Sequence, residues 1–352
     1  MVRRQDTPGT PQCNAALDIN TTSPPSTMTI PKDTSNSWTD FTPPVKISKS
    51  HPWISRHHPS DISNSNVSSG LISTADQEVY GNPDHAIAFR IGNGGAGWTG
   101  ILENLCLSFI AQHGNDFRIA WVVNHSRHSL IALLADIAQV ALTYEPDIEK
   151  MAEKEGWCKR VTAPVFWDHL MLVGPHSNPA RVAAGATTMQ VLQSIAEHQA
   201  LFHTRGDGSA THEREQKLWP AAEVDVGTAS WLLVRGSTPY EALKMAEQEQ
   251  AYLLTDRGTF LTAKRDDIIP SLVVYAEGEE VLLNPCSSLV NLKVSESRQQ
   301  GLAVTFAEWL GGQDAQEIIR EYGEGWPNGM PLFTVRTQQE FEHEERLSGK
   351  TL

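Results

Sequence analysis

The sequence lacks the long apolar runs, the basic clusters and the paired cysteines that mark several protein classes. No apolar run reaches the roughly 18 residues that would span a membrane. Lysine and arginine total 28 against 42 aspartate and glutamate, which gives a net charge of −14. We therefore expect no nucleic acid partner and no membrane insertion, because both call for basic or apolar surface.

The four cysteines are widely spaced and form no C-x-x-C motif, so we predict neither a disulfide framework nor a metal site; they are Cys13, Cys106, Cys158 and Cys286. Cys106 lies in an apolar helical stretch and is expected in the core. The G-x-S-x-G and H-E-x-x-H motifs are absent as well, and no pair of nucleophile and base stands out.

The N-terminus carries two arginines but no apolar segment behind them. A secretory signal needs such a segment, so we expect a cytoplasmic protein, or a secreted one if the native start lies elsewhere. Residues 1–80 are rich in Ser, Thr, Pro and Asn and have little apolar periodicity, which predicts a disordered leader.

From about residue 85, short strands and helices alternate, which predicts an α/β fold with parallel strands. The predicted strands are 85–91, 117–123, 139–144, 160–166, 169–174, 251–255, 272–277 and 287–292. The predicted helices are 98–112, 129–136, 146–156, 187–200, 211–219, 239–250, 301–310 and 314–322. The run Thr238-Pro-Tyr-Glu241 has the form of a capping box and supports the helix that follows it.

Residues 203–219 gather the side chains of an anion-binding site immediately before a helix. Arg205 and the hydroxyls of Thr204, Ser209 and Thr211 precede a helix start, where unpaired N–H groups carry partial positive charge. An ordinary turn with an N-cap would use similar residues. The loop is therefore a candidate oxyanion site with a structural alternative.

A glycine-rich loop, Gly92-Asn-Gly-Gly-Ala-Gly97, follows the first strand and opens the first helix. It matches G-x-G-x-x-G, and Arg127 after the second strand suits a 2′-phosphate, so an NADP-binding oxidoreductase is an alternative. Trp98 and Thr99 stand where such folds continue into small residues, which counts against it. Trp98 and Trp121 are expected in the core.

Several polar residues lie at strand ends, where α/β sheets bind ligands. This pattern predicts one shared site; its members are Asn93, Gly94, Gly95, Thr99, Ser126, Arg127, Thr143, Arg205, Asp207, Ser209, Thr211, Thr255 and Arg257. Glu145 follows the third strand and is unexplained in an anion site.

The order of Arg205-Gly-Asp-x-Ser-x-Thr-His, Leu254-Thr-Asp-Arg-Gly-Thr259, Asn284-Pro285 and Gly329-Met-Pro-Leu-Phe333 resembles the substrate-binding component of tungstate ABC transporters. These belong to the type II periplasmic-binding-protein family. The resemblance implies two α/β lobes joined by hinge crossings near 163–169 and 276–288. It places lobe I at 85–165 plus 280–336, lobe II at 166–279 and a polar tail at 337–352.

By this resemblance, Arg205, Ser209 and Thr211 bind an oxyanion and Asp207 orders their turn. Thr255, Asp256 and Arg257 match a second signature, although Asp256 and Arg257 could serve only to brace the hinge. The first-lobe loop departs from the family, because Gly92-Asn-Gly-Gly95 replaces a hydroxyl-rich run, and this points to a different or larger anion.

We therefore predict a protein that binds a small anionic ligand, tungstate-like or metabolite-like, between two lobes, without chemistry and without a cofactor. An enzyme acting on an anionic substrate with the same fold is the alternative, because one fold hosts many functions. A transporter or pathway partner would be implied in either case.

Overall fold

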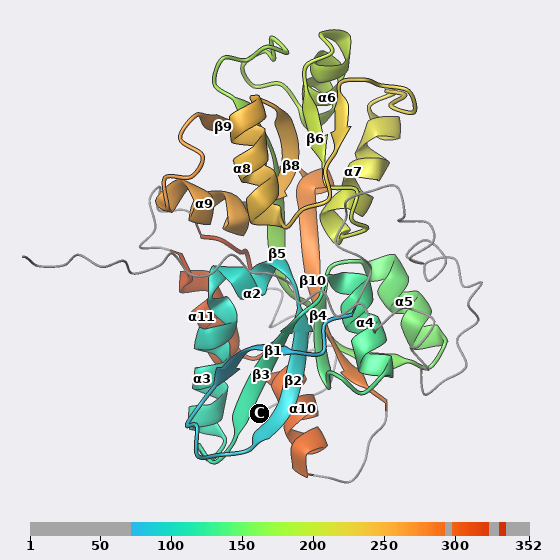
Figure 1. Cartoon of the computed structure of the whole chain (residues 1–352). Coiled ribbons are helices and arrows are strands. Elements are labelled where there is room, and N and C mark those ends of the chain that lie inside the picture. The colour runs from blue at the N-terminus through green and yellow to red at the C-terminus, as the bar shows by residue number, and fades with distance from the viewer. Residues whose placement is uncertain (1–71, 293–297, 324–330, 336–352) are drawn as a thin grey trace, which may run out of the picture.

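A computed structural model describes residues 72–292, 298–323 and 331–335. These residues form two α/β lobes, one above the other in Figure 1, which are joined by the long strands β5 (Cys158–Pro175) and β10 (Leu283–Asn291). The predicted two-lobed α/β architecture is confirmed.

The first lobe is built on a sheet with the strand order β1-β3-β2-β4-β10-β5. Strand β2 pairs in parallel with β3 and β4, whereas β10 is antiparallel to β4. The strands are β1 (Asp76–Tyr80), β2 (Ile87–Asn93), β3 (Arg118–Val123) and β4 (Val140–Thr143). The helices are α2 (Gly95–Thr99), α3 (Ile101–Gln112), α4 (Ser126–Leu134), α5 (Pro146–Lys154), α10 (Arg298–Trp309) and α11 (Gln313–Glu321).

The second lobe continues from the other half of β5, which pairs with β8 and β9, while β8, β6 and β7 follow in parallel. Its strands are β6 (Phe202–Thr204), β7 (Leu232–Val234), β8 (Tyr252–Asp256) and β9 (Leu272–Ala276). Its helices are α6 (Thr188–Glu197), α7 (Ala210–Ala221), α8 (Pro239–Glu249), α9 (Arg257–Arg265) and the short 3-10 helix η1 (Glu280–Leu282).

Strand β5 corrects one sequence prediction, because the strands expected at 160–166 and 169–174 are a single strand. The polar residues Asp168 and His169 interrupt its apolar pattern, yet both are buried where the strand leaves one lobe for the other. Up to His169 the strand pairs with β10, and from Leu170 it pairs with β8. The lobes therefore meet at residues 169–170 of a continuous strand.

Two further boundaries differ from the sequence prediction. Residues 76–80, expected in the disordered leader, form β1, which pairs antiparallel with β3; residues 1–71 lie outside the described part of the chain. The helix expected at 98–112 is divided by Gly100, whose φ of 90° is left-handed and ends α2. The expected capping box is confirmed, since Thr238 Oγ1 accepts from Glu241 N and Glu241 Oε2 accepts from Thr238 N.

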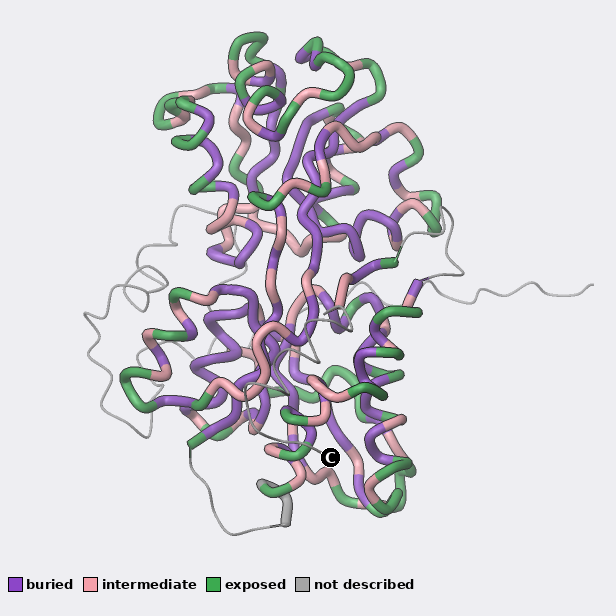
Figure 2. The backbone as a smooth tube through the Cα atoms, turned by 180° about the vertical axis from the view of Figure 1, so that it is seen from behind, coloured by how far each residue is buried: buried purple, intermediate pink, exposed green. Residues whose placement is uncertain are grey.

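Apolar side chains are buried along the central strands, which appear mostly purple, with pink stretches, in Figure 2. In the first lobe, Phe89 and Phe109 pack against Phe306 of α10. In the second, Trp219 of α7 packs edge-on against Phe202, with ring centroids 4.9 Å apart. Burial of each such side chain contributes about 1.5–3 kcal/mol, which holds the strand ends in place.

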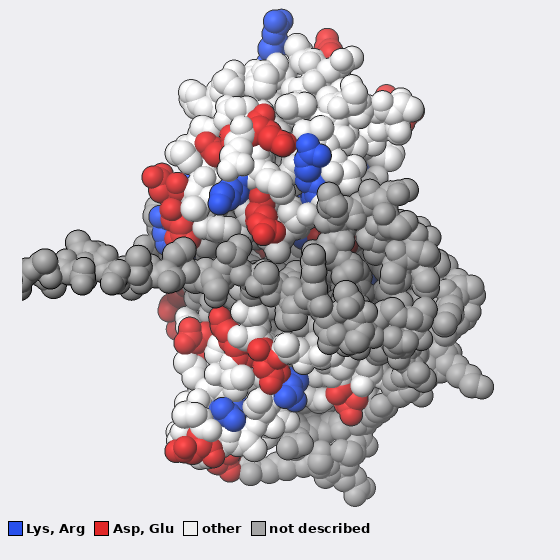
Figure 3. All heavy atoms as spheres, in the orientation of Figure 1, with Lys and Arg blue, Asp and Glu red and all other residues white. Residues whose placement is uncertain are grey.

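None of the described helices is both long and apolar enough to cross a bilayer. On the face seen in Figure 3, acidic and basic side chains are interspersed, and the basic ones gather into no continuous patch.

Candidate functional site

Four strand-to-helix turns of the described chain converge where the two lobes meet. In each of them a helix begins shortly after a strand ends; the four pairs are β2–α2, β3–α4, β6–α7 and β8–α9. A Cβ placed on Gly94 would lie 3.3 Å from the carbonyl oxygen of Asn124, so the turns of the first lobe touch each other. A Cβ on Gly258 of α9 would lie 2.7 Å from Thr99 Cγ2, so the lobes are in direct contact. The four turns therefore lie where the lobes contact each other.

In the first lobe, Asn93 holds the glycine-rich loop in place. Its Oδ1 accepts from Gly97 N at 2.8 Å, and its Nδ2 donates to Leu142 O at 3.0 Å. Its carbonyl oxygen accepts from Trp121 Nε1 at 2.8 Å. Both polar atoms of this side chain are used within the fold, so Asn93 supports the loop, and Gly94 and Gly95 present bare backbone.

Thr99 and Thr143, both predicted site residues, also hydrogen-bond within the first lobe. Thr99 Oγ1 donates to Ala96 O, and Thr143 Oγ1 donates to Glu149 Oε1, each at 2.7 Å. Thr99 nevertheless lies at the lobe contact, against Gly258. The backbone N–H of Glu145 donates to the same Glu149 oxygen as Thr143 does.

At the start of α4, Arg127 connects the two lobes. Its Nε and Nη2 each lie 2.9 Å from Glu145 Oε2, and its Nη2 lies 2.8 Å from Glu213 Oε2 on α7. Neighbouring Ser126 uses Oγ to accept from Tyr144 N. His125 and His128 stack on each other with ring centroids 3.7 Å apart. The structure therefore places Arg127 at the lobe contact, where it pairs with two carboxylates.

The second-lobe loop has the form predicted for it. Asp207 Oδ1 accepts from Ser209 N at 3.0 Å, which orders the turn, and Ser209 Oγ accepts from His212 N as the N-cap of α7. Gly206 and Gly208 have φ values of 60° and 68°, which only glycine adopts without strain. Thr211 is buried in the first turn of the helix.

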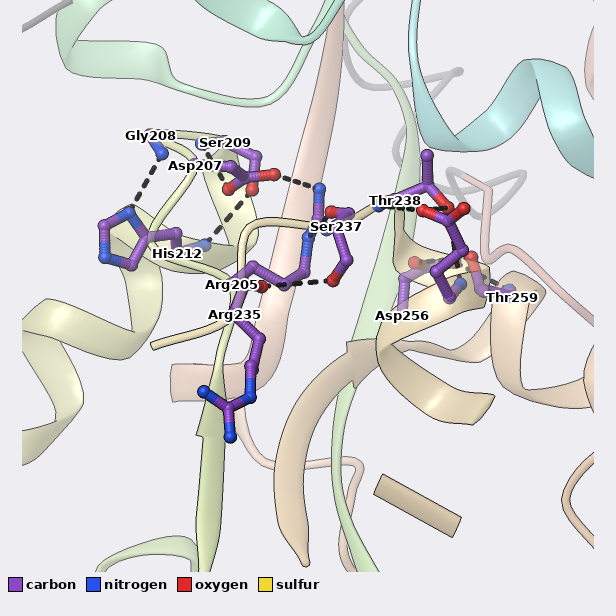
Figure 4. A network of polar contacts seen from close by, with 11 residues as sticks. Arg205, Asp207, Gly208, Ser209, His212, Arg235, Ser237, Thr238, Asp256 and Thr259 are labelled. Atoms are coloured by element: carbon purple, nitrogen blue, oxygen red, sulfur yellow. Dashed lines mark hydrogen bonds and ion pairs between the residues drawn. The ribbon is translucent and has the colours of Figure 1, made fainter. Parts of the chain in front are cut away.

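Arg205 of this loop already has two partners. Its Nη2 pairs with Asp207 Oδ2, and its Nε donates to Ser237 O at 3.3 Å, as Figure 4 shows. Burial raises the pKa of Asp207, but the Arg205 charge and hydrogen bonds from Ser209 outweigh it and hold that pKa below its usual range. The guanidinium is therefore fixed beside the start of α7.

The third group of predicted residues divides in two. Asp256 caps α9 by accepting from Thr259 N, and Arg257 donates to Pro331 O and Glu277 Oε2, so these two brace the fold. Thr255 Oγ1, in contrast, is buried and has no hydrogen-bond partner among the described residues. A buried hydroxyl without a partner is costly, which sets Thr255 apart from its two neighbours.

Trp98 was predicted in the core, and the structure corrects this. Its side chain is 40% exposed and packs edge-on against the fully buried Trp121. Cys106, Cys158 and Cys286 are free and buried, while Cys13 lies outside the described residues. Among the described residues, no three His, Cys, Asp or Glu side chains gather in a way that could hold a metal ion.

Comparison with known proteins identifies the family. The PBP superfamily domain matches residues 87–313, which is most of the described chain. The chain belongs to the PBP superfamily. This PBP fold is shared with the tungstate-binding protein TupA of Desulfovibrio alaskensis, with a TM-score of 0.61 at 25% identity over 72% of this chain and 100% of that one. A solved periplasmic protein has a TM-score of 0.64 at 28% identity, over 74% and 99%.

Sequence comparison gives the same relationship. The tungstate-binding protein TupA of Peptoclostridium acidaminophilum is 32% identical over 48% of this chain and 59% of its own length. TupA of Campylobacter jejuni is 26% identical over 64% of this chain and 82% of its own. The chain thus spans little more than half the length of the first of these relatives.

The family relationship overturns two expectations. The predicted cytoplasmic location is wrong, because the similar proteins include a periplasmic protein and the tungstate ABC transporter of Geobacter sulfurreducens, which is 26% identical. The NADP-binding alternative also loses its structural basis. A dinucleotide fold would continue its sheet beyond β4 with a parallel strand, whereas the next strand is the antiparallel β10.

Sequence reasoning missed two residues of this candidate site and assigned no role to a third. Glu213 reaches Arg127 only because α7 packs against the other lobe, and Ser237 contributes a backbone carbonyl, which no sequence pattern reveals. Glu145 was noticed without a role. The signal that could have singled it out is an acidic residue just after a buried strand, when an arginine follows the preceding strand along the chain.

Proposed function

We propose that this protein binds a small oxyanion between its two lobes and releases it unchanged. The observation that carries the proposal is that the N-terminal ends of α4 and α7 face each other across the lobe contact, joined by the 2.8 Å contact between Arg127 and Glu213. Helix N-termini offer unpaired N–H groups and partial positive charge, which suit an anion in a dehydrated site.

Two buried polar atoms and the start of α7 support this proposal. Thr255 Oγ1 and Arg127 Nη1 are buried polar atoms without a hydrogen-bond partner in the described chain. Ser209 and Thr211 lie at the start of α7 next to Arg205, which supplies fixed charge. Tungstate is the ligand named for the TupA relatives, so tungstate and molybdate are the first candidates.

The proposal extends to the partner. A protein that closes over an anion without chemistry serves to deliver it, and one solved relative is part of the tungstate ABC transporter of Geobacter sulfurreducens. We therefore propose the membrane component of an ABC transporter as the partner. No described pair of side chains favours the enzyme alternative.

The test is a thermal-shift series with tungstate, molybdate, sulfate, phosphate and small carboxylates. A true ligand at about a hundred times its Kd stabilises the folded protein by about 2.7 kcal/mol. Thr255→Val is the decisive variant, because it removes an unpaired hydroxyl and keeps the shape of the side chain. We expect it to keep its stability but to bind the anion more weakly by about 1.5–3 kcal/mol.

Arg205→Ala should abolish the ligand-induced shift. Arg235→Ala is the matched control, since Arg235 lies near the same loop but is exposed and pairs with Glu249. An unchanged melting temperature with every anion, at concentrations up to millimolar, would reject the proposed function.

A further inference from the structure

The lobe contact contains a buried group of charges with an excess of carboxylates. Arg127 lies between Glu145 of its own lobe and Glu213 of the other, with contacts of 2.9 and 2.8 Å. Arg127 is 2% exposed and Glu145 8% exposed. One guanidinium therefore faces two carboxylates, of which Glu145 is buried and Glu213 is partly exposed.

The neighbouring charges do not balance this excess. Glu149, on the same helix as Glu145, is buried behind it and accepts from the Glu145 backbone N–H at 3.1 Å. On α7, His212 lies beside Glu213, and burial lowers the pKa of its ring, so it adds no charge at neutral pH. Arg160 of β5 lies near Glu149, whereas Lys217 is exposed and pairs with Asp147. His125 and His128 stack at the start of α4.

An oxyanion entering this site adds further negative charge. Burying an uncompensated charge is expensive, and like charges at short range in a dry site cost several kcal/mol. A carboxyl group under such conditions takes up a proton and becomes neutral. Anion binding and protonation are then expected to occur together.

Several carboxyl oxygens in the described chain are buried without a hydrogen-bond partner, including Glu149 Oε2, but only that of Glu145 belongs to a side chain that also contacts Arg127. Arg127 Nη1 and Glu145 Oε1 are both buried without a hydrogen-bond partner in the described chain, and they belong to side chains that already touch through other atoms. Nη1 can donate to an anion oxygen. Oε1 repels an anion when ionised, but it donates a hydrogen bond when protonated.

We propose that Glu145 is a ligand-contacting residue that carries a proton in the closed, anion-bound protein, so that each bound oxyanion is accompanied by the uptake of one proton. This inference rests on the proposed oxyanion-binding function. It gives Glu145 a role that an ionised carboxylate in an anion site lacks.

The electrostatics of the closed site support the inference. Burial raises the pKa of Glu145 to about 7 in spite of Arg127, and the nearby carboxylates of Glu213 and Glu149 add to the rise. Because Glu213 belongs to the other lobe, opening the clamp removes that carboxylate and admits water. The open form then holds Glu145 ionised at neutral pH, and closure draws in the proton.

The test is calorimetric titration with tungstate, molybdate and sulfate, which carry no titratable proton at neutral pH. Each titration is run in two buffers of different ionisation enthalpy, so that the proton uptake is measured directly. We expect uptake approaching about one proton per anion near pH 7.5, and an affinity that falls by up to about tenfold per pH unit in that range.

Glu145→Gln mimics the protonated side chain and should bind the same anions with no proton uptake and a flat pH dependence. Asp147→Asn is the matched control, because it removes an exposed carboxylate from the same helix and should leave the uptake unchanged.

Anion binding without proton uptake in the unmodified protein would overturn the inference and leave the proposed function intact. Equal uptake in Glu145→Gln would overturn it too, since another group would then hold the proton. If no anion binds at all, both the inference and the proposed function fail. The proton count of the unmodified protein decides the matter even if Glu145→Gln does not fold.

Discussion

Gly97 gives the sharpest test of how the first-lobe loop is held. A Cβ at this position would lie 2.1 Å from Trp121 Cζ2 and 2.2 Å from Cε2, far inside van der Waals contact. Trp121 cannot withdraw easily, because its side chain is fully buried and its Nε1 donates to Asn93 O at 2.8 Å. Gly97→Ala therefore forces the loop or the indole ring to move.

The expected cost follows from the packing. Extra methyl groups in a well-packed core destabilise by about 1–3 kcal/mol, while alanine regains about 0.5–1 kcal/mol over glycine in a helix. Because the approach of 2.1 Å is a severe overlap, we expect the upper end of the packing cost and a net loss in the free energy of unfolding of about 2 kcal/mol. It would be measured as a lower urea midpoint at unchanged slope. Oxyanion affinity should fall as well, because the ring and Asn93 support the loop.

Gly301→Ala is the matched control, since Gly301 is exposed in α10 and a Cβ there meets nothing within 4 Å. This substitution should raise stability by about 0.5–1 kcal/mol. The two substitutions are identical in chemistry and opposite in expected sign. Gly97→Ala with the stability of the unmodified protein would refute the packing argument.

Two further predictions concern a helix cap and a buried acid. Ser209→Ala and Thr238→Ala each remove a helix cap, so each should lower the free energy of unfolding by about 0.5–2 kcal/mol in urea denaturation. Only Ser209→Ala should also weaken oxyanion binding. Equal effects of the two substitutions on binding would contradict the proposed site. Burial raises the pKa of Glu215 to about 8, so its folded form holds a proton that the unfolded chain loses near pH 4.5, and stability should fall as pH rises through this window. Glu215→Gln should flatten that part of the stability profile, and an unchanged slope would show that the carboxyl is ionised in the fold.

The structure of the second-lobe loop could be predicted from short-range hydrogen bonding. Its turn, its N-cap and the pairing of Asp207 with the loop depend on residues within five positions of each other, and all of these follow from side-chain hydrogen-bonding habits. The capping box at Thr238 was predictable for the same reason. Strand β1 was not, because Asp76–Tyr80 becomes a strand only by pairing with β3, far along the chain.

Which of the candidate site residues are left free for a ligand could not be predicted from the sequence. Asp256 and Arg257 belong to a recognisable signature, yet the fold commits them to capping α9 and binding Glu277, while Thr255 beside them is left with an unpaired hydroxyl. No local pattern separates these neighbours. Their partners come from α9 and from residues that follow β9.

Periodicity predicted the α/β class, and side-chain hydrogen bonding predicted the turn and helix cap in residues 205–211, because both depend on short spans of the chain. The two-lobed architecture was predicted from the resemblance to a known family. The contacts of Arg127 with Glu145 of its own lobe and Glu213 of the other could be seen only in the folded chain. The same holds for Asn93, whose side chain hydrogen-bonds within the fold and supports its loop. Those contacts join residues from separate elements, and their energies depend on burial. Charge balance inside the clamp is therefore a property of the closed fold.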